Sequence, residues 1–480
     1  MRRTTLRLAA LPLLALAAAA CASSSAEPAS FAPAAAVAGA MRVDAIAAPD
    51  EARALLFTIY PTPRVVEYGT SLLPLAGALQ VDDASPDFDE RLRAAGLESG
   101  WKELPREGYV LCVAAENGRA VVLKAAHDDA GKRWAEQALA QVSLESGSRR
   151  FVRECRVLDA PVFRLRGSKR PQAWETRYRA NFAWGARDDA DTRGRTMAAV
   201  YAPGIPLDAS GAGVARALEF FRPWQERGVR LCAVKFDDES FAVTADSELR
   251  YGRFAPALVG YLKLLRQGLR RRDPDAHLYL LPQTYWWNDD RLEPFASAIR
   301  TAGGLDEDVG LVFTGPEVIS REIDAEGLAT ARRAFGATET RALLYDNLGR
   351  EGDWGPLTGR DPRLAQICDG VFGERGTPVH RLTRLDWLWN PSGYDPERSW
   401  RRAMLELAGP QGYTRLAAVC AAFRRGASQA DVGPLVDALA TASGPWKGSL
   451  PREDLVALLR GDVERIGAPD AAPSRPTTRP

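Results

Sequence analysis

Short apolar segments alternate with amphipathic helical segments through the middle of this 480-residue chain. Short, nearly continuous apolar runs are typical of strands buried on both faces of a parallel sheet. The segments between them, such as Ala215–Arg227 and Phe254–Arg270, repeat apolar residues at helical spacing. The candidate strands are Arg164–Gly167, Asn181–Gly185, Met197–Ala202, Leu231–Phe236, Leu278–Pro282, Val309–Thr314, Ala342–Tyr345, Gly370–Gly373 and Asp386–Leu388. Their number is close to eight, which predicts an α/β fold of the (β/α)8 barrel type rather than an open sheet.

The candidate strand Leu231–Phe236 runs directly into two adjacent carboxylates, Asp237 and Asp238. Acids at the carboxyl end of a barrel strand lie where this fold keeps its chemistry. Two neighbouring carboxylates resist ionising together, which favours one of them as a general acid. The alternative is that Asp238 and Glu239 only cap the following helix.

Polar and aromatic residues follow most of the other candidate strands in the same way. Because strand ends of a barrel converge on one mouth, these clusters predict a pocket lined by carboxylates, amides and aromatic rings. The clusters are Arg187-Asp188-Asp189, Tyr285-Trp286-Trp287-Asn288, Thr314-Gly315-Pro316-Glu317, Asp346-Asn347, Glu374 and Trp389-Asn390-Pro391.

Two further units flank the predicted barrel, which we place at 161–398. Residues 57–160 are expected to form a small α+β domain, and 399–466 a set of helices packed on the barrel. The α+β domain has candidate strands and helices at Val65–Glu67, Ala78–Val81, Asp87–Ala95, Tyr109–Ala114, Ala120–Ala125 and Gly131–Leu144. Ala, Ser and Pro dominate 22–56, which predicts a flexible linker, with ordered structure starting near Phe57. The tail 467–480 is predicted to be disordered.

The first 21 residues have the pattern of an export signal. Arg2 and Arg3 precede the apolar run Leu8–Ala20, which is too short for a membrane span of about 20 residues. Small residues immediately before Cys21 resemble a bacterial lipobox, in which that cysteine is lipidated; the alternative is an ordinary signal peptide. Either interpretation predicts an exported protein, in the bacterial cell envelope or outside the cell, that meets the membrane only through this anchor.

The amino-acid composition limits the kinds of catalytic site that this chain can form. The 63 basic and 62 acidic residues nearly cancel, which argues against a nucleic-acid binder. Three histidines and five further cysteines are scattered without metal-ligand spacing, so we expect no metal, no other cofactor and no Ser-His-Asp triad. Carboxylates are then the expected catalytic groups, and the twelve tryptophans suit stacking on sugar rings as well as packing in the core.

A series of motifs, in order along residues 57–405, resembles glycoside hydrolase family 84, the retaining β-N-acetylglucosaminidases. The motifs are Ile59-Tyr60-Pro61-Thr62-Pro63, the stretch from Arg179 to Asp189, Phe236-Asp237-Asp238, Pro282-Gln283-Thr284-Tyr285, Thr314-Gly315-Pro316-Glu317-Val318, Tyr345-Asp346-Asn347 and Trp387-Leu388-Trp389-Asn390-Pro391. The resemblance implies a barrel enzyme acting on a glycan or glycoprotein that contains N-acetylhexosamine.

The resemblance also implies a substrate-assisted mechanism, in which the acetamido oxygen of the sugar is the nucleophile. Asp237 would polarise the acetamido N–H, and Asp238 would act as general acid and then base. Tyr285 would orient the acetamido group, Asn347 would contact the reacting sugar, and Asp353 would bind its outer hydroxyls.

The pocket departs from the family at four places. Only Gly167 remains of a glycine-rich family loop; Arg187 takes the place of a lysine, Tyr345 of a tryptophan, and Glu374 of an asparagine. These changes leave two alternatives to a standard enzyme: a catalytically weak or silent carbohydrate-binding lipoprotein, and an enzyme for an acidic or modified hexosamine.

Overall fold

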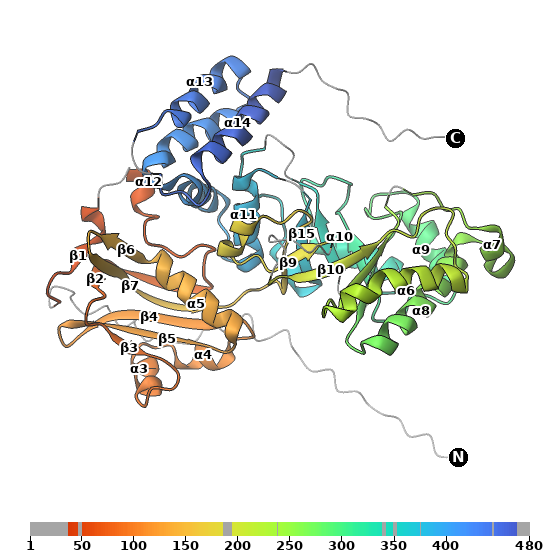
Figure 1. Ribbon diagram of the computed structural model, residues 1–480, viewed down its shortest axis with the longest axis horizontal. Helices are drawn as coiled ribbons and strands as arrows, with labels where there is room; N and C mark the ends of the chain where they lie inside the picture. Colours follow the sequence, from red (N-terminus) through yellow and green to blue (C-terminus); the bar gives the residue numbers. More distant parts are fainter. Residues whose placement is uncertain are drawn as a thin grey trace.

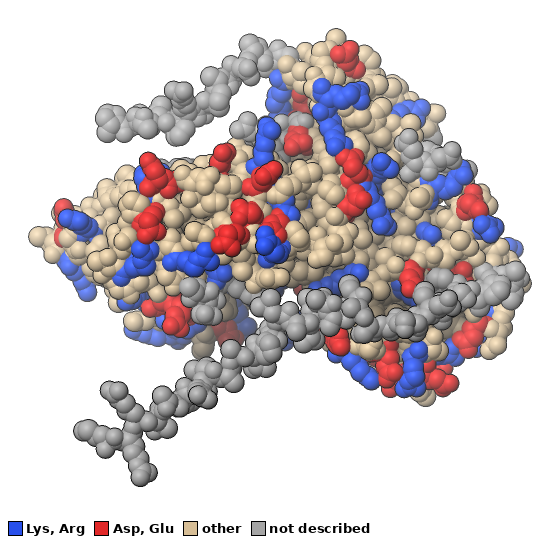
Figure 2. Space-filling view, turned by 180° about the vertical axis from the view of Figure 1, so that it is seen from behind, with Lys and Arg blue, Asp and Glu red and all other residues tan. Residues whose placement is uncertain are grey.

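The computed structural model describes residues 37–46, 50–185, 194–237, 239–337, 342–348, 353–374, 376–443 and 446–467. Figure 1 shows three units in chain order: a β-sheet with helices, a barrel surrounded by helices, and a group of helices at the C-terminal end. Lys and Arg side chains are interspersed with Asp and Glu on the face seen in Figure 2. None of the described helices combines the length and apolar character needed to cross a lipid bilayer.

In the described part of the chain, eight parallel strands close into a barrel in the order β10-β11-β12-β13-β14-β15-β8-β9. The predicted (β/α)8 fold is therefore confirmed. The strands are β8 (Leu165–Ser168), β9 (Phe182–Trp184), β10 (Thr196–Tyr201), β11 (Leu231–Lys235), β12 (His277–Leu281), β13 (Gly310–Phe313), β14 (Ala342–Asp346) and β15 (Cys368–Gly373).

Helices follow the barrel strands and cover their outer faces (Figure 1). They are α6 (Gly211–Glu226), α7 (Ala245–Tyr251), α8 (Phe254–Arg272), α9 (Leu292–Thr301), α10 (Ala325–Ala334) and α11 (Pro378–Trp389), with short 3-10 helices η3 (Ala173–Tyr178) and η4 (Pro362–Gln366). The apolar stripe of α8, including Leu258, Leu262 and Leu265, is buried in the core between helices and barrel.

The predicted strand Asp386–Leu388 is wrong, because these residues form the last turn of α11. This helix begins at Pro378, after the Thr377 side chain accepts a hydrogen bond from the His380 N–H. Every described residue of α11 is buried, and a helix that is buried all round has no polar face to reveal its period.

The N-terminal unit is a seven-stranded sheet with the order β1-β2-β7-β4-β5-β3 and β6 paired to β7. Its elements are β1 (Met41–Arg42), η2 (Val43–Ala45), α2 (Asp50–Arg53), β2 (Val65–Pro74), β3 (Leu79–Val81), α3 (Phe88–Ala94), α4 (Glu98–Glu103), β4 (Tyr109–Glu116), β5 (Arg119–Ala126), α5 (Asp129–Gln141), β6 (Ser143–Ser146) and β7 (Arg149–Asp159). The predicted helix Gly131–Leu144 therefore ends too late, since Leu144 lies in β6.

Structure begins inside the stretch that the sequence predicts to be a linker. Met41 pairs with Leu72 of the sheet, and Ala52, Leu55 and Leu56 are buried. The predicted start of order near Phe57 is thus too late. Cys21, the signal segment and the predicted disordered tail from 468 onward lie outside the described residues.

The C-terminal unit consists of α12 (Pro396–Arg424), α13 (Gln429–Ala440) and α14 (Arg452–Gly467). Within α12, Gly409 has a φ of 68° and precedes Pro410, so the helix is broken there. This break agrees with the sequence, in which the predicted helices Ser399–Ala408 and Gly412–Arg425 lie on either side of Gly409-Pro410. The helices pack on the barrel, with Trp354 stacked on Phe423 at a centroid distance of 6.0 Å.

The Trp-Asn-Pro motif, predicted at the barrel mouth, lies instead at the joint between barrel and sheet. Trp389 packs in the hydrophobic core of the N-terminal unit against Trp134, and its carbonyl accepts a 3.0 Å hydrogen bond from Val162, just before β8. Asn390 donates its side-chain amide to the carbonyl of Pro63 over 3.0 Å. The motif ends a helix that runs back from the mouth, so it reaches the amino end of the barrel.

The segment that leads into the sheet is bound by barrel and C-terminal helices. The backbone N–H of Thr62 donates to the Asp386 carboxylate on α11, and Arg402 on α12 donates to the carbonyl of Thr58 over 2.8 Å. The N-terminal unit is therefore held from two sides.

Candidate active site

The side chains of β11 alternate between the barrel interior and the surrounding helices. Leu231 and Ala233 belong to the interior cluster, whereas Cys232 and Val234 belong to the outer core. The same alternation directs Lys235 and Asp237 to the interior side at the carboxyl end of the strand. The predicted acid is thus in the barrel mouth.

The Asp237 side chain is 16% exposed, and its Oδ1 lies 3.2 Å from the Lys235 Nζ. This contact is an ion pair without hydrogen-bond geometry, and the buried Oδ1 has no hydrogen-bond partner among the described residues. Asp238, which follows it in sequence, lies outside the described residues, and so does Arg187.

Three aromatic rings stack beside each other in the interior cluster. Tyr345 of β14 stacks on Phe372 of β15 with a centroid distance of 4.8 Å, and Trp184 of β9 stacks on the same ring at 4.5 Å. Tyr285, after β12, packs edge-on against Trp286 at 4.9 Å. These buried rings form an apolar layer in the barrel interior at the carboxyl ends of the strands.

The Tyr345 hydroxyl joins three strand ends. It donates a 2.5 Å hydrogen bond to Glu374 after β15 and accepts one of 3.1 Å from Lys169 after β8. Lys169 and Glu374 also form an ion pair of 2.9 Å. Burial raises the pKa of the Tyr345 phenol far above its usual value, and the hydrogen bond to Glu374 and the nearby Asp237 carboxylate raise it further. The phenol therefore stays protonated and keeps donating.

Several buried polar atoms around these strand ends have no partner in the described part of the chain. Asn347, after β14, donates its amide to the carbonyl of Val318 over 3.0 Å, but its Oδ1 is buried without a hydrogen bond. Gln283, after β12, is 3% exposed and neither of its amide heteroatoms has a partner. Buried polar groups are nearly always satisfied, so these atoms are open to hydrogen bonds from water or from a polar ligand.

Gln283 was missed as a site residue from the sequence. The available signal was its position two residues after Leu281, which faces the interior, in the stretch that ends at Tyr285. Side chains alternate between the two faces of a strand, so Gln283 is expected on the same inner side as Leu281.

Two predicted sugar contacts have other surroundings. A Cβ on Gly167 would lie 1.9 Å from the carbonyl oxygen of Phe182, so this glycine permits the close approach of β8 and β9. Asp353 accepts a hydrogen bond from the Gly355 N–H, and its carbonyl accepts one from Thr377 at the start of α11. Neither residue is linked by a described contact to Asp237.

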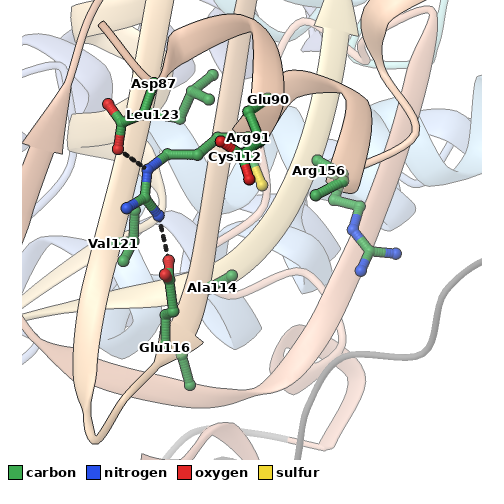
Figure 3. A pocket seen from close by; sticks show the side chains of 12 residues that line it. Asp87, Glu90, Arg91, Cys112, Ala114, Glu116, Val121, Leu123 and Arg156 are labelled. Atoms are coloured by element: carbon green, nitrogen blue, oxygen red, sulfur yellow. Dashed lines mark hydrogen bonds and ion pairs between the residues drawn. The ribbon is translucent and has the colours of Figure 1, made fainter. Parts of the chain in front are cut away.

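A separate cavity of about 370 Å³ lies in the N-terminal unit (Figure 3). Arg91 is fixed there between the carboxylates of Asp87 and Glu116. Burial raises the pKa of the neighbouring Cys112 thiol to about 11, so it is a poor nucleophile at neutral pH. The barrel mouth is therefore the candidate active site.

Solved structures similar to this chain support the barrel fold. The structure of CpGH84D matches with a TM-score of 0.60 and 14% identity, covering 85% of this chain and 87% of the other. CpGH84B matches with a TM-score of 0.59 and 16% identity over 85% and 89% of the two chains. A mutant of the Thermobaculum terrenum O-GlcNAc hydrolase matches with a TM-score of 0.52 and 17% identity over 64% and 82%.

Sequence comparison identifies the family. Residues 172–421 match the family described as beta-N-acetylglucosaminidase, and this segment contains seven of the eight barrel strands and the Asp237 site. Because the match spans more than half of the chain, this protein belongs to the β-N-acetylglucosaminidases of glycoside hydrolase family 84 and is a glycoside hydrolase of that type.

Proposed function

We propose that this enzyme removes β-linked N-acetylglucosamine, or a close N-acetylhexosamine, by a substrate-assisted retaining mechanism. The observation that carries the proposal is the Asp237 carboxylate, which lies in the barrel mouth beside Tyr345, is 16% exposed and is paired through Oδ1 with the Lys235 ammonium. Such a largely buried carboxylate is suited to accept, through Oδ2, the N–H of the substrate acetamido group.

In the first step, the acetamido oxygen attacks the anomeric carbon while the glycosidic bond breaks. Asp238 gives its proton to the departing oxygen, and Asp237 accepts a hydrogen bond from the acetamido N–H, whose nitrogen becomes more positive. In the second step, Asp238 takes a proton from water as the water oxygen attacks the anomeric carbon and the acetamido group is restored. No enzyme nucleophile is required.

Other side chains of the mouth support the sugar in this scheme. Tyr285 orients the acetamido group, and the unpartnered Asn347 Oδ1 accepts a sugar hydroxyl. The interior aromatic rings exclude water around them, which strengthens the interaction of Asp237 with developing positive charge.

The test is hydrolysis of an aryl β-N-acetylglucosaminide by wild type, Asp237→Asn and Asp238→Asn. We expect each substitution to lower kcat by at least about 100-fold, because each removes an interaction made in the transition state. Asp89→Asn, an exposed acid on α3, is the control. An inactive wild type across a panel of N-acetylhexosaminides rejects the activity, and equal turnover of the corresponding aryl glucoside rejects the substrate-assisted step.

A second candidate is a catalytically silent carbohydrate-binding protein. It is favoured by the hydrogen bonds among Tyr345, Glu374 and Lys169, because Tyr345 and Glu374, two predicted sugar contacts, bond to each other. Calorimetry with N-acetylglucosamine decides: binding without turnover supports this candidate, while hydrolysis that Asp238→Asn abolishes excludes it.

We further propose that the protein is exported and anchored through a lipid on Cys21. The support is the basic and apolar leader that ends in small residues at this cysteine. Expression in a bacterium fed labelled palmitate should label wild type but not Cys21→Ser, with Cys112→Ser as the control. Wild-type protein that is released from the cell and carries no palmitate label would support an ordinary signal peptide.

A further inference from the structure

We propose that Lys235 is a positioning residue that fixes the carboxylate of Asp237 for the acetamido group. The inference rests on the proposed function, and it adds a residue that has no counterpart among the predicted site residues. Lys235 acts through Asp237 and does not itself touch the sugar in this proposal.

The position of Lys235 in the barrel is unusual for a lysine. It is the last residue of β11 and follows Leu231 and Ala233 on the interior face of the strand. Its side chain is 39% exposed, so the aliphatic stem lies along the barrel interior and the ammonium reaches toward the mouth. A charge at the edge of a packed interior is retained only where a counter-charge compensates for lost hydration.

That counter-charge is Asp237. The Lys235 Nζ lies 3.2 Å from Oδ1, and no other ion pair to Asp237 is formed within the described ranges. The other lysine near the mouth, Lys169, is paired with Glu374 at 2.9 Å. Each lysine therefore has its own acid, and Lys235 is the cation assigned to the polarising carboxylate.

The two oxygens of Asp237 then have different tasks. Lys235 attracts Oδ1, which leaves Oδ2 available to the acetamido N–H. A carboxylate tethered through one oxygen keeps the other in a fixed direction, and misplacing a group by about 1 Å can cost about 100-fold in rate.

A double-mutant cycle tests the proposal, with an activated aryl N-acetylglucosaminide so that slow variants remain measurable. We expect Lys235→Met to lower kcat by about 10- to 100-fold with KM changed by less than about threefold, because orientation is lost and binding is largely kept. Lys235→Arg keeps the positive charge and should recover most of the lost kcat.

The cycle pairs Lys235→Met with Asp237→Asn. If Lys235 acts through Asp237, the double variant is no slower than Asp237→Asn alone, whereas independent effects multiply. Lys169→Met, whose ion-pair partner is Glu374, is the matched control and should multiply with Asp237→Asn. Thermal unfolding of each variant separates kinetic effects from loss of fold.

Two results overturn the inference: a Lys235→Met enzyme with wild-type kcat, or a double variant slowed by the product of the single effects. Both leave the proposed function standing as long as wild type is active and Asp237→Asn is impaired. A wild type that hydrolyses no N-acetylhexosaminide rejects the proposed function and, with it, the role of Lys235.

Discussion

The indole N–H of Trp389 donates a 2.8 Å hydrogen bond to Oδ1 of Asp159, which joins the last residue of α11 to the last residue of β7. The other carboxylate oxygen accepts from Arg179 at 2.7 Å and from Tyr109 at 2.8 Å. The Arg179 guanidinium also lies over the Trp389 ring, 4.1 Å from its centroid. A buried, fully bonded carboxylate thus connects sheet and barrel.

Asp159→Asn should destabilise the protein by about 3 kcal/mol. The substitution leaves the buried Arg179 guanidinium without its counter-charge, which is the costly way to break a buried pair. Chemical denaturation measures the loss. Asp437→Asn, which breaks an ion pair whose side chains are 57% and 68% exposed, is the control and should cost less than about 1 kcal/mol. Similar costs at both sites would show that the joint contributes little.

Tyr345→Phe should lower kcat/KM by about tenfold while changing the free energy of unfolding by only about 1 kcal/mol. The ring keeps its stack on Phe372, but Glu374 and Lys169 lose the hydroxyl that joins them. Steady-state kinetics gives the effect. Tyr261→Phe is the control, because its buried hydroxyl has no hydrogen-bond partner in the described structure. Wild-type kinetics for Tyr345→Phe would argue that the bridged hydroxyl is irrelevant to the sugar.

Gly167→Ala should destabilise the barrel by about 3 kcal/mol, since the new methyl group meets the backbone of Phe182 and cannot be accommodated by a side-chain rotation. Gly461→Ala, in α14 where the added Cβ would meet only the end of the Arg465 side chain at 3.5 Å, should stabilise by about 0.5–1 kcal/mol. Urea midpoints of the two variants give the comparison. A Gly167→Ala protein with normal stability and weaker sugar binding would instead support the predicted sugar-binding role of Gly167.

The stability of wild type relative to His380→Leu should fall as pH drops from about 6.5 to about 4. Burial, together with the nearby Arg384 cation, lowers the pKa of His380 to about 4. In that window the unfolded chain binds a proton that the folded chain does not, so acid favours unfolding by up to about 3 kcal/mol. Denaturation of both proteins at several pH values isolates this contribution, because their other groups are shared.

The same substitution at the exposed His277 controls for the loss of a histidine elsewhere. A pH-independent difference between wild type and His380→Leu would show that His380 does not titrate in this range.

The barrel was predictable because its strands are buried on both faces, so each is a separate apolar run. The position of Asp237 followed from the same rule, since it directly continues such a run. Asp386–Leu388 was wrongly predicted as a strand because α11 is buried on all sides, so its apolar residues show no helical repeat.

The sequence hid other features for physical reasons. Strand β7 was missed because charged residues such as Arg153 and Glu154 interrupt it, although the strand lies between β2 and β4. The guanidinium of Arg153 lies over the Tyr68 ring and bonds backbone carbonyls, including that of Gly69. Lys235 was missed because it lies inside the predicted strand Leu231–Phe236, where a single charge among apolar residues does not indicate a site. Only the ion pair with Asp237 reveals its place.

The hydrogen bonds of Thr62 to Asp386 and of Arg402 to Thr58 join the N-terminal unit to the rest of the protein. A gene fragment that encodes only one side of this contact is therefore expected to give an unstable product. A shortened gene that encodes only the barrel and later helices would remove the Thr62 N–H from the Asp386 carboxylate and the Asp159 acceptor from the Trp389 indole, and it would expose the tryptophan to water. Recombination or domain exchange that separates the leading sheet from the enzyme body is therefore expected to yield insoluble protein, and the two parts should be inherited together.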